Sequence, residues 1–552
     1  MRSIFAQVGN QIKIFFSNRI VGILCTLVSI AAINSIQQTI GNLGWDNSFS
    51  IAAAKNMYEG HGYSIRLASP EDIAKTVYEP LNKWPPGYSI LLLIIHAISS
   101  LDWIESAFLL NAIGLTLLVL VFKKMLLQLE FPKWIVNLSV LYFGFIFHSF
   151  LGVYFTDIFA LLFFMIGCSI LLKYVNGGQS NIILVVLSAL FFSLSAWLKY
   201  LYFGLAFIPL ASLFYFGWKR KIKKIKVASK AGLIVAGILI FLLVYFQLRN
   251  TGSMIYIKPS SATGFFPSQL LGLAPIVPGT FLNLDFINMQ ISTHLFIPYQ
   301  SVFLLWSIVN ILCLFCIAFI GWPIIKNPEY LKEDFLVFYT RVVLWVSAFI
   351  FIFLGLLTVH FNSHYKDMMY PWVFVGIPRY FSPVCFFIFQ FIIYLFLKPN
   401  FFPKKVVYYL FCILLVCVVI EEISHTTYFV AKKIFFKKEF GLKRPDDQRE
   451  LRASHFVNSE LEKTSQTVVC AGIPEISNFC SLSGISSIMD YSLFQKPIRC
   501  SKEVLIITTL DSFSVKLMPV EFFKLDTRLV AHQSGYLYYF TFIHPNKGFE
   551  KF

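Results

Sequence analysis

Runs of about twenty apolar residues recur through most of this chain, and they constrain its fold more than any other feature. A helix of that length crosses the ~30 Å hydrocarbon core of a bilayer. Backbone in lipid must satisfy its own hydrogen bonds, and the alternating pattern of a membrane barrel is absent, so the runs predict helices. With 57% hydrophobic and 14% charged residues, the chain is not a soluble protein. The runs predict about eleven spanning helices, at 19–41, 104–122, 133–152, 157–173, 181–198, 200–217, 231–248, 300–325, 335–357, 380–397 and 406–424.

The formal net charge of +17 does not indicate nucleic acid as a partner. The basic residues flank the apolar runs, as expected where lysine and arginine collect on the cytoplasmic side of a membrane. The ten cysteines lie mostly alone inside apolar runs, where they behave as small hydrophobic residues. Their spacing does not indicate a metal site.

The apolar segment 88–101 decides the topology, because it is shorter than a spanning helix. If it crossed the membrane, the basic run 219–230 and the other lysine-rich loops would face outward, against the positive-inside rule. We therefore expect 88–101 to lie in or dip into the outer face, with the N-terminus inside. The outer segments are then 42–103, the short turn 153–157, 249–299 and 358–379.

The composition changes near residue 425. Residues 425–455 are basic and amphipathic, and short strands are expected at 467–469, 504–507 and 536–542. The predicted fold is an all-α polytopic membrane domain over residues 1–424, with a small α/β extramembrane domain over 425–552. Eleven spans place this second domain outside.

Few ionisable residues remain at the outer boundary of the membrane, and three of them stand out. Asp46 follows the first span and Asp157 begins another, where either could simply cap a helix. The helix after Asp46 is expected over about 47–58, with Gly60 ending it. Lys199 occupies a tight hairpin, where a lysine opposes the charge rule and is a functional candidate.

Further cations lie near the same boundary. Lys83 precedes the rigid pair Pro85–Pro86, which fixes how the chain re-enters the membrane, and Arg379 heads a later span. Lysine and arginine hold phosphate groups, and a nearby carboxylate can accept a proton from an attacking hydroxyl. One base and several cations would suffice to transfer a sugar from a lipid phosphate.

In order along the chain, these residues resemble a known family. An acidic residue after the first span, then AAAKNMYEGHGYS and KWPPGYS, is similar to the first outer loop of C-type membrane glycosyltransferases (GT-C fold). The resemblance is to the bacterial protein O-mannosyltransferase and lipid A aminoarabinose transferase group. It extends over roughly residues 20–400 through YFTD, AWLKY and RYFSP. Many members have Asp-Glu where this chain has Asp46-Asn47, so a metal or a second carboxylate is not assigned to that position.

The resemblance implies an enzyme of the bacterial inner (cytoplasmic) membrane whose active site faces the periplasm or exterior. Its donor would be a polyprenyl-phosphate-linked sugar, and its acceptor a lipid, a glycan or a protein. Asp46 would be the base or would orient the acceptor, and Asp157 would order the site. The residues implied in binding the donor phosphate are Lys83, Lys199 and Arg379, together with Tyr88 and Tyr365.

Cofactors and other function classes stay open at this point. A divalent metal stays open as a cofactor. The three outward histidines (His61, His294 and His364) could bind one, but they are scattered along the sequence. A transporter or flippase would instead place charges in the middle of broken spans. A glycan polymerase or ligase would be expected to rely on arginines and histidines of the outer loops. The membrane lipids are partners in every case.

Overall fold

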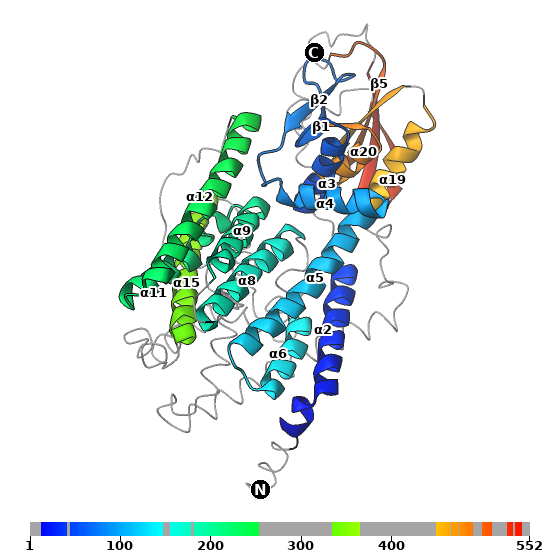
Figure 1. Ribbon diagram of the computed structural model, residues 1–552. Coiled ribbons are helices and arrows are strands. Elements are labelled where there is room, and N and C mark those ends of the chain that lie inside the picture. The colour runs from blue at the N-terminus through cyan, green and yellow to red at the C-terminus, as the bar shows by residue number, and fades with distance from the viewer. Residues whose placement is uncertain are drawn as a thin grey trace.

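The computed structural model describes residues 11, 13–40, 45–146, 155–177, 181–252, 334–364, 449–464, 466–472, 474–488, 499–510, 527–533 and 536–543. A bundle of long helices carries a mixed β-sheet at one end, and the short helices α3 (Trp45–Tyr58) and α4 (Gly87–Ser99) lie where the two parts meet (Figure 1). The described part of the chain is therefore mostly helical, with its strands gathered in one mixed sheet. The helices of the bundle are α2 (Arg19–Ile40), α5 (Trp103–Gln128), α6 (Lys133–Ile146), α8 (Phe155–Asn176), α9 (Ile182–Leu198), α10 (Tyr202–Leu205), α11 (Ile208–Lys219), α12 (Lys223–Thr251) and α15 (Asp334–His364).

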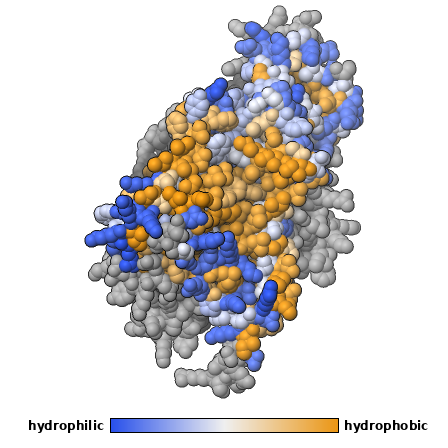
Figure 2. All heavy atoms as spheres, in the orientation of Figure 1, coloured by the Kyte–Doolittle hydropathy of each residue, from blue (hydrophilic) through white to orange (hydrophobic). Residues whose placement is uncertain are grey.

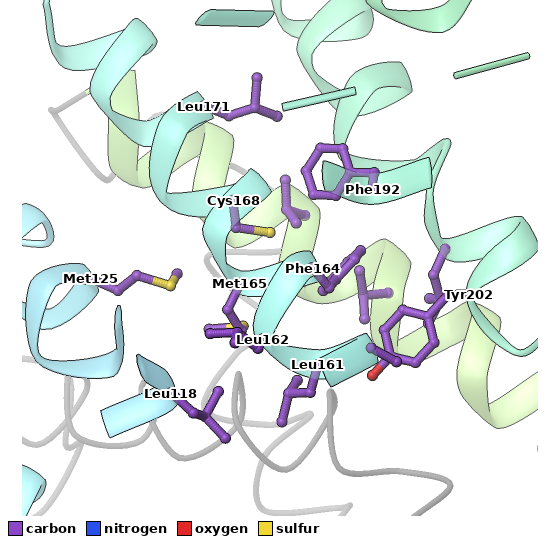
Figure 3. Close-up of a cluster of buried hydrophobic side chains, with 14 of the residues drawn as sticks. Leu118, Met125, Leu161, Leu162, Phe164, Met165, Cys168, Leu171, Phe192 and Tyr202 are labelled. Atoms are coloured by element: carbon purple, nitrogen blue, oxygen red, sulfur yellow. The ribbon is translucent and has the colours of Figure 1, made fainter. Parts of the chain in front are cut away.

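The bundle is built around a continuous apolar core. Helix α8 lies at its centre, with Phe164 and Met165 fully buried against side chains of α5 and α9 (Figure 3). Phe164 stacks at a tilt against Phe192 of α9, with ring centroids 5.3 Å apart. Close packing of this kind fixes the relative positions of α8 and α9, which carry two of the predicted site residues.

The outside of the bundle is also apolar. On α12, exposed large side chains recur every three or four residues, which puts them on one face: Ile234, Ile238, Phe241, Tyr245 and Leu248. An apolar band crosses the helices, and a hydrophilic patch lies at the end where α11 passes into α12 (Figure 2). The exposed lysines and arginine of 219–224 belong to this end. Such a band between polar ends is what a bilayer requires.

Three helices of the described part are long and apolar enough to cross a membrane: α5, residues Thr156–Asn176 of α8, and α12. Four more apolar helices are shorter, within α2, α4, α9 and α15. The predicted spans 300–325, 380–397 and 406–424 lie outside the described residues. The number of eleven spans stays a prediction.

The predicted single helix over 200–217 is wrong in detail, because two helices occupy this segment. Helix α10 ends at Leu205, and α11 starts at Ile208 with Pro209 in its first turn. Proline lacks a backbone N–H and is tolerated where the first N–H groups of a helix have no intrahelical partner. The helical path is therefore interrupted and restarts just before the proline.

The segment expected to dip into the outer face is helix α4. It has 13 residues, so it extends ~20 Å and is shorter than the ~30 Å hydrocarbon core. It starts directly after Pro86 and ends at Ser100, whose φ of 57° is left-handed. Asp102 then caps the start of α5, because its carboxylate accepts the N–H groups of Ile104 and Glu105 at 2.8 and 2.7 Å. The chain thus turns between two helices without an extended crossing.

A seven-stranded mixed sheet has the order β2-β1-β4-β3-β5-β7-β6. All three strands expected in the C-terminal region are present, but two strands of the sheet come from the first outer loop. Helices α19 (Arg449–Leu461) and α20 (Pro474–Leu482) contribute to the apolar cluster on one face of the sheet. The strands are β1 (Ser64–Ala68), β2 (Thr76–Pro80), β3 (Thr467–Gly472), β4 (Ser486–Ile488), β5 (Val504–Leu510), β6 (Thr527–Gln533) and β7 (Tyr536–Ile543).

Side chains fasten the loop hairpin to the C-terminal strands. β1 pairs with β4 in parallel at Leu67 and Ser487. The hydroxyl of Ser487 donates to the carbonyl oxygen of Arg66 at 3.0 Å, and the hydroxyl oxygens of Thr76 and Ser486 lie 2.7 Å apart. A shared sheet requires that both segments lie on the same side of the membrane. The boundary at residue 425 stays a prediction, since the sheet extends across it in sequence.

Candidate functional site

A buried ion pair joins two of the predicted site residues. Asp157 lies in the first turn of α8 and its residue is 2% exposed. Lys199 follows the last residue of α9, and its ammonium group pairs with Oδ1 of Asp157. The packing of α8 against α9 therefore brings the acid of YFTD and the lysine of AWLKY together at one end of the bundle.

The second oxygen of this carboxylate is also buried. Oδ2 of Asp157 has no hydrogen-bond partner among the residues that the structure describes. Removing one member of a buried pair leaves an uncompensated charge and typically costs about 3–5 kcal/mol. We therefore expect the pair to contribute strongly to stability.

The segment KWPPGYS packs directly against AWLKY. A Cβ atom on Gly87 would lie 2.5 Å from the carbonyl oxygen of Trp197, so only glycine fits this close approach. The hydroxyl of Tyr200 donates to the carbonyl oxygen of Asn82 at 2.9 Å. On the other side, the amide of Gln247 in α12 donates to the carbonyl oxygen of Trp84 at 3.5 Å. The proline pair is therefore held between the α9–α10 turn and α12.

Tyr63 fixes the same segment from within the first loop. Its hydroxyl lies 3.0 Å from the carbonyl oxygen of Trp84 and 3.2 Å from that of Pro85. Burial, followed by the nearby Tyr200, raises the pKa of Tyr63 well above its usual range. The hydroxyl therefore stays protonated and keeps donating at neutral pH and above.

Lys83 begins this segment and lies among aromatic rings. Its ammonium group is 4.8 Å from the ring centre of Trp84 and 6.0 Å from that of Phe49. Cation–π contacts orient the ammonium without neutralising its charge. Phe49 and Trp84 pack with ring centroids 4.9 Å apart, which connects KWPPGYS to α3.

Asp46 lies in the first turn of α3, which starts at Trp45. The helix was expected to begin after Asp46, but it includes this residue. The predicted stop at Gly60 is confirmed, since Gly60 has a φ of +84°. Phe49 and Ser50, three and four residues later, share a helix face with Asp46. The hydroxyl of Ser50 donates to the carbonyl oxygen of Asp46 at 3.1 Å. The carbonyl oxygen of Ser50 in turn accepts the hydroxyl of Ser89 at 2.7 Å. The face of α3 that carries Asp46 therefore meets KWPPGYS.

Tyr88 lies in the apolar core of the bundle. Its side chain is fully buried, and its ring centroid lies 6.2 Å from that of Phe159 in α8. A tyrosine ring in this position packs α4 against α8, which favours a structural role over contact with phosphate. The other two predicted phosphate-binding residues, Arg379 and Tyr365, lie outside the described residues.

The histidines give no metal cluster within the described chain. No group of three potential ligand side chains occurs there. His61 stacks on Tyr78 with ring centroids 3.8 Å apart. His294 lies outside the described residues, and His364 is the last residue of α15.

Sequence reasoning missed several residues that position the site. Tyr63, Tyr200 and Gln247 bond to the backbone of the loop, and Ser89 bonds to the backbone of α3, but their own chemistry is ordinary. Gln247 could have been noticed in the sequence, because a polar side chain within the apolar run of α12 is unusual. It is fully buried in the structure.

Comparison with known proteins supports the fold at low sequence similarity. No protein-family model and no curated protein sequence matches the chain. One solved structure with a similar fold is ArnT from Cupriavidus metallidurans in the apo state, so the fold is GT-C-like. The TM-score is 0.50 and the identity 10%, with 94% of this chain and 97% of that chain covered. ArnT from the same organism bound to undecaprenyl phosphate matches with a TM-score of 0.47, also at 10% identity and with the same coverage.

Proposed function

We propose that this chain is a membrane glycosyltransferase that moves a sugar from a polyprenyl-phosphate-linked donor to an acceptor. The acceptor would be a lipid, a glycan or a protein on the outer face of a bacterial cytoplasmic membrane. The catalytic part would comprise residues 1–424, with 425–552 as an α/β domain on the same side as the site.

The observation that carries the proposal is the meeting of three separate motifs around the Asp157–Lys199 pair. YFTD and AWLKY join through this ion pair, and KWPPGYS packs on AWLKY through Gly87. Helix α3, with Asp46 in its first turn, packs on KWPPGYS through Phe49 and Ser50. A GT-C-like fold supports the same class of enzyme, and the resemblance in the first outer loop supports the polyprenyl-phosphate donor.

The chemistry needs one base and an anion site. An acceptor hydroxyl attacks the anomeric carbon of the donor sugar, the new glycosidic bond forms, and the bond to the phosphate oxygen breaks. Asp46 accepts the hydroxyl proton, and the electron pair of the broken bond leaves with the polyprenyl phosphate. Phosphate is a weak base, so its departure requires no general acid.

Cationic groups would hold the phosphate through this change. Lys199 is oriented by Asp157, and Lys83 is oriented by Trp84 and Phe49. We assign Arg379 and Tyr365 to the same group on the family resemblance, with Tyr88 supporting the pocket from the core side. Charge-assisted contacts of lysine and arginine with phosphate are strong because both partners are ionised.

The test is consumption of a synthetic polyprenyl-phosphate sugar by purified protein in detergent, read as release of polyprenyl phosphate in the presence of a lipid acceptor. A panel of sugars is needed, and the Asp46→Asn variant provides the inactive control. Movement of intact donor across sealed vesicles without release of polyprenyl phosphate would instead identify a flippase. Failure with the whole panel, in folded protein, would count against the proposal.

A further inference from the structure

We propose that helix α20 of the C-terminal region positions α3, and through it Asp46, with Asn478 as the positioning residue. This inference rests on the proposed function, because it concerns the group assigned as its base. It gives the C-terminal region a part in catalysis.

The contact that carries this proposal lies two residues from Asp46. The side-chain amide of Asn478 donates to the hydroxyl oxygen of Ser48 at 3.0 Å. Ser48 and Asn478 are each 1% exposed. A buried hydrogen bond between two side chains is directional, and separating its members leaves polar groups away from water. The contact therefore favours one rotation of α3 over others.

Apolar side chains seat α20 between the sheet and the bundle. Ile476 and Cys480 belong to the apolar cluster on the sheet. Phe479 is buried in the main cluster of the bundle, and Leu482 packs against that cluster. Ile476 and Cys480, four residues apart, share the face of α20 that packs on the sheet. Phe479 and Leu482, three residues apart, share the face that packs on the bundle. Because both sides of α20 are packed, Asn478 has a fixed position relative to the bundle.

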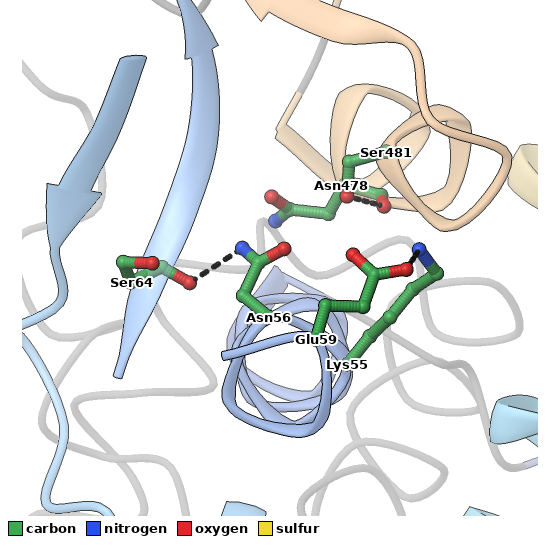
Figure 4. A network of polar contacts seen from close by, with 6 residues as sticks. All are labelled: Lys55, Asn56, Glu59, Ser64, Asn478 and Ser481. Atoms are coloured by element: carbon green, nitrogen blue, oxygen red, sulfur yellow. Dashed lines mark hydrogen bonds and ion pairs between the residues drawn. The ribbon is translucent and has the colours of Figure 1, made fainter. Parts of the chain in front are cut away.

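The far end of α3 is fixed as well. Asn56 donates its side-chain amide to the carbonyl oxygen of Ser64, the first residue of β1, at 2.8 Å. Figure 4 shows Asn56 and Asn478 on the facing sides of α3 and α20, next to the ion pair between Lys55 and Glu59. Polar contacts near both ends restrain the helix along its axis and around it. The helix that carries Asp46 is thereby held by α20 and β1 in addition to its own packing in the bundle core through Ile51 and Ala54, whereas Asp157 and Lys199 are held by α8 and the end of α9.

This separation predicts a specific kinetic effect. Shifting α3 displaces the base and leaves the Asp157–Lys199 pair in place. Misplacement of a catalytic group by ~1 Å can reduce turnover by ~10²-fold. We expect Asn478→Ala to reduce kcat by about 10- to 100-fold while KM for the donor changes little.

The experiment combines Asn478→Ala, Ser48→Ala and the double variant in a cycle, with kcat and KM measured for the donor. If the two side chains act as one unit, the double variant loses no more than either single variant. Ser459→Ala is the matched control, since its hydroxyl donates within α19 to the carbonyl oxygen of Phe456. It should retain normal kcat.

Hydrogen exchange of the amides in α3 is the second measurement, and it does not depend on activity. Faster exchange confined to α3 in folded Asn478→Ala is the expected result, and Ser48→Ala replaces that variant if it fails to fold. Unchanged exchange in α3, normal kcat, or additive losses with a parallel rise in KM would each overturn the positioning role. A wild-type protein that consumes no donor would instead overturn the proposed function, and the positioning role would be lost with it.

Discussion

The two carboxylates of the candidate site are held by different parts of the molecule. Asp157 lies in the first turn of a 22-residue helix in the centre of the bundle and pairs with Lys199, which follows the adjacent helix α9. Asp46 lies in the first turn of a 14-residue helix between the bundle and the sheet. Its neighbour Ser48 contacts α20, and Ser50 contacts the start of α4.

This difference separates two tasks. A carboxylate that pairs with a lysine inside a packed core orients that lysine and stabilises its charge. A carboxylate on a short helix, restrained by several separate segments, can be aligned with a substrate entering from the membrane surface. The comparison therefore favours Asp46 as the proton acceptor and Asp157 as the residue that orders the anion site.

The largest expected effect comes from exchanging each acid for its amide. Asp46→Asn keeps the size and shape of the side chain but removes the proton acceptor, so turnover should fall ~10²–10⁴-fold. Asp157→Asn should reduce donor affinity as well as turnover and should lower the melting temperature. Steady-state kinetics with both variants measures the difference. Equal losses of kcat with unchanged donor KM in both would remove the distinction between the two acids.

Breaking the ion pair should have the next largest effect. Lys199→Ala leaves a buried carboxylate without its ammonium partner, which should reduce the free energy of unfolding by about 3–5 kcal/mol and weaken donor binding. The double variant Asp157→Asn/Lys199→Met should recover most of the stability, because no uncompensated charge remains. Thermal unfolding and donor binding are the measurements. Recovery of donor binding in the double variant would show that Lys199 serves only the fold.

The sequence predicted the pieces of the site better than their attachments. Apolar run length identified the helices, and the positive-inside rule put Asp46 and Asp157 on one side. That 88–101 lies in or dips into the outer face followed from its short length together with the positive-inside rule. These features depend on local composition, which is why they could be predicted.

The attachments depend on contacts between residues far apart in the sequence. β1 joins β4 across more than 400 positions, and neither strand carries a signal that names its partner. The Asp157–Lys199 pair was not predicted either, since each residue alone was consistent with a cap or a phosphate contact. Helix α20 was missed because its small polar and apolar residues gave no period that points to α3.

A smaller effect is expected at the contact between KWPPGYS and AWLKY. Gly87→Ala would put a methyl group 2.5 Å from the carbonyl oxygen of Trp197, a backbone atom that cannot rotate away. Such overpacking costs about 1–3 kcal/mol, and it should displace Lys83 relative to Lys199. The melting temperature and the affinity for the donor should both fall.

Gly237→Ala is the matched control for this substitution. Its added methyl group would meet nothing within 4 Å, and replacing glycine inside a helix stabilises by roughly 0.5–1 kcal/mol. A Gly87→Ala protein as stable and active as Gly237→Ala would show that the two motifs can separate without consequence.

The smallest expected effect tests the junction between the first loop and the C-terminal strands. Burial raises the pKa of Asp72, but hydrogen bonds from Ser501, the N–H of Ala74 and Lys75 outweigh it and hold the pKa below the usual range of an aspartate. Oδ1 of Asp72 accepts the N–H of Ser501 at 2.9 Å. A lowered folded pKa stabilises the junction at pH values above the unfolded pKa, and this contribution is lost as the pH falls through the folded pKa. Asp72→Asn should therefore lower the melting temperature slightly at pH 6, with the difference from wild type disappearing towards pH 3. Glu71→Gln removes an equal charge from the exposed neighbouring position and controls for net charge. A difference that grows as the pH falls would contradict this account of the junction.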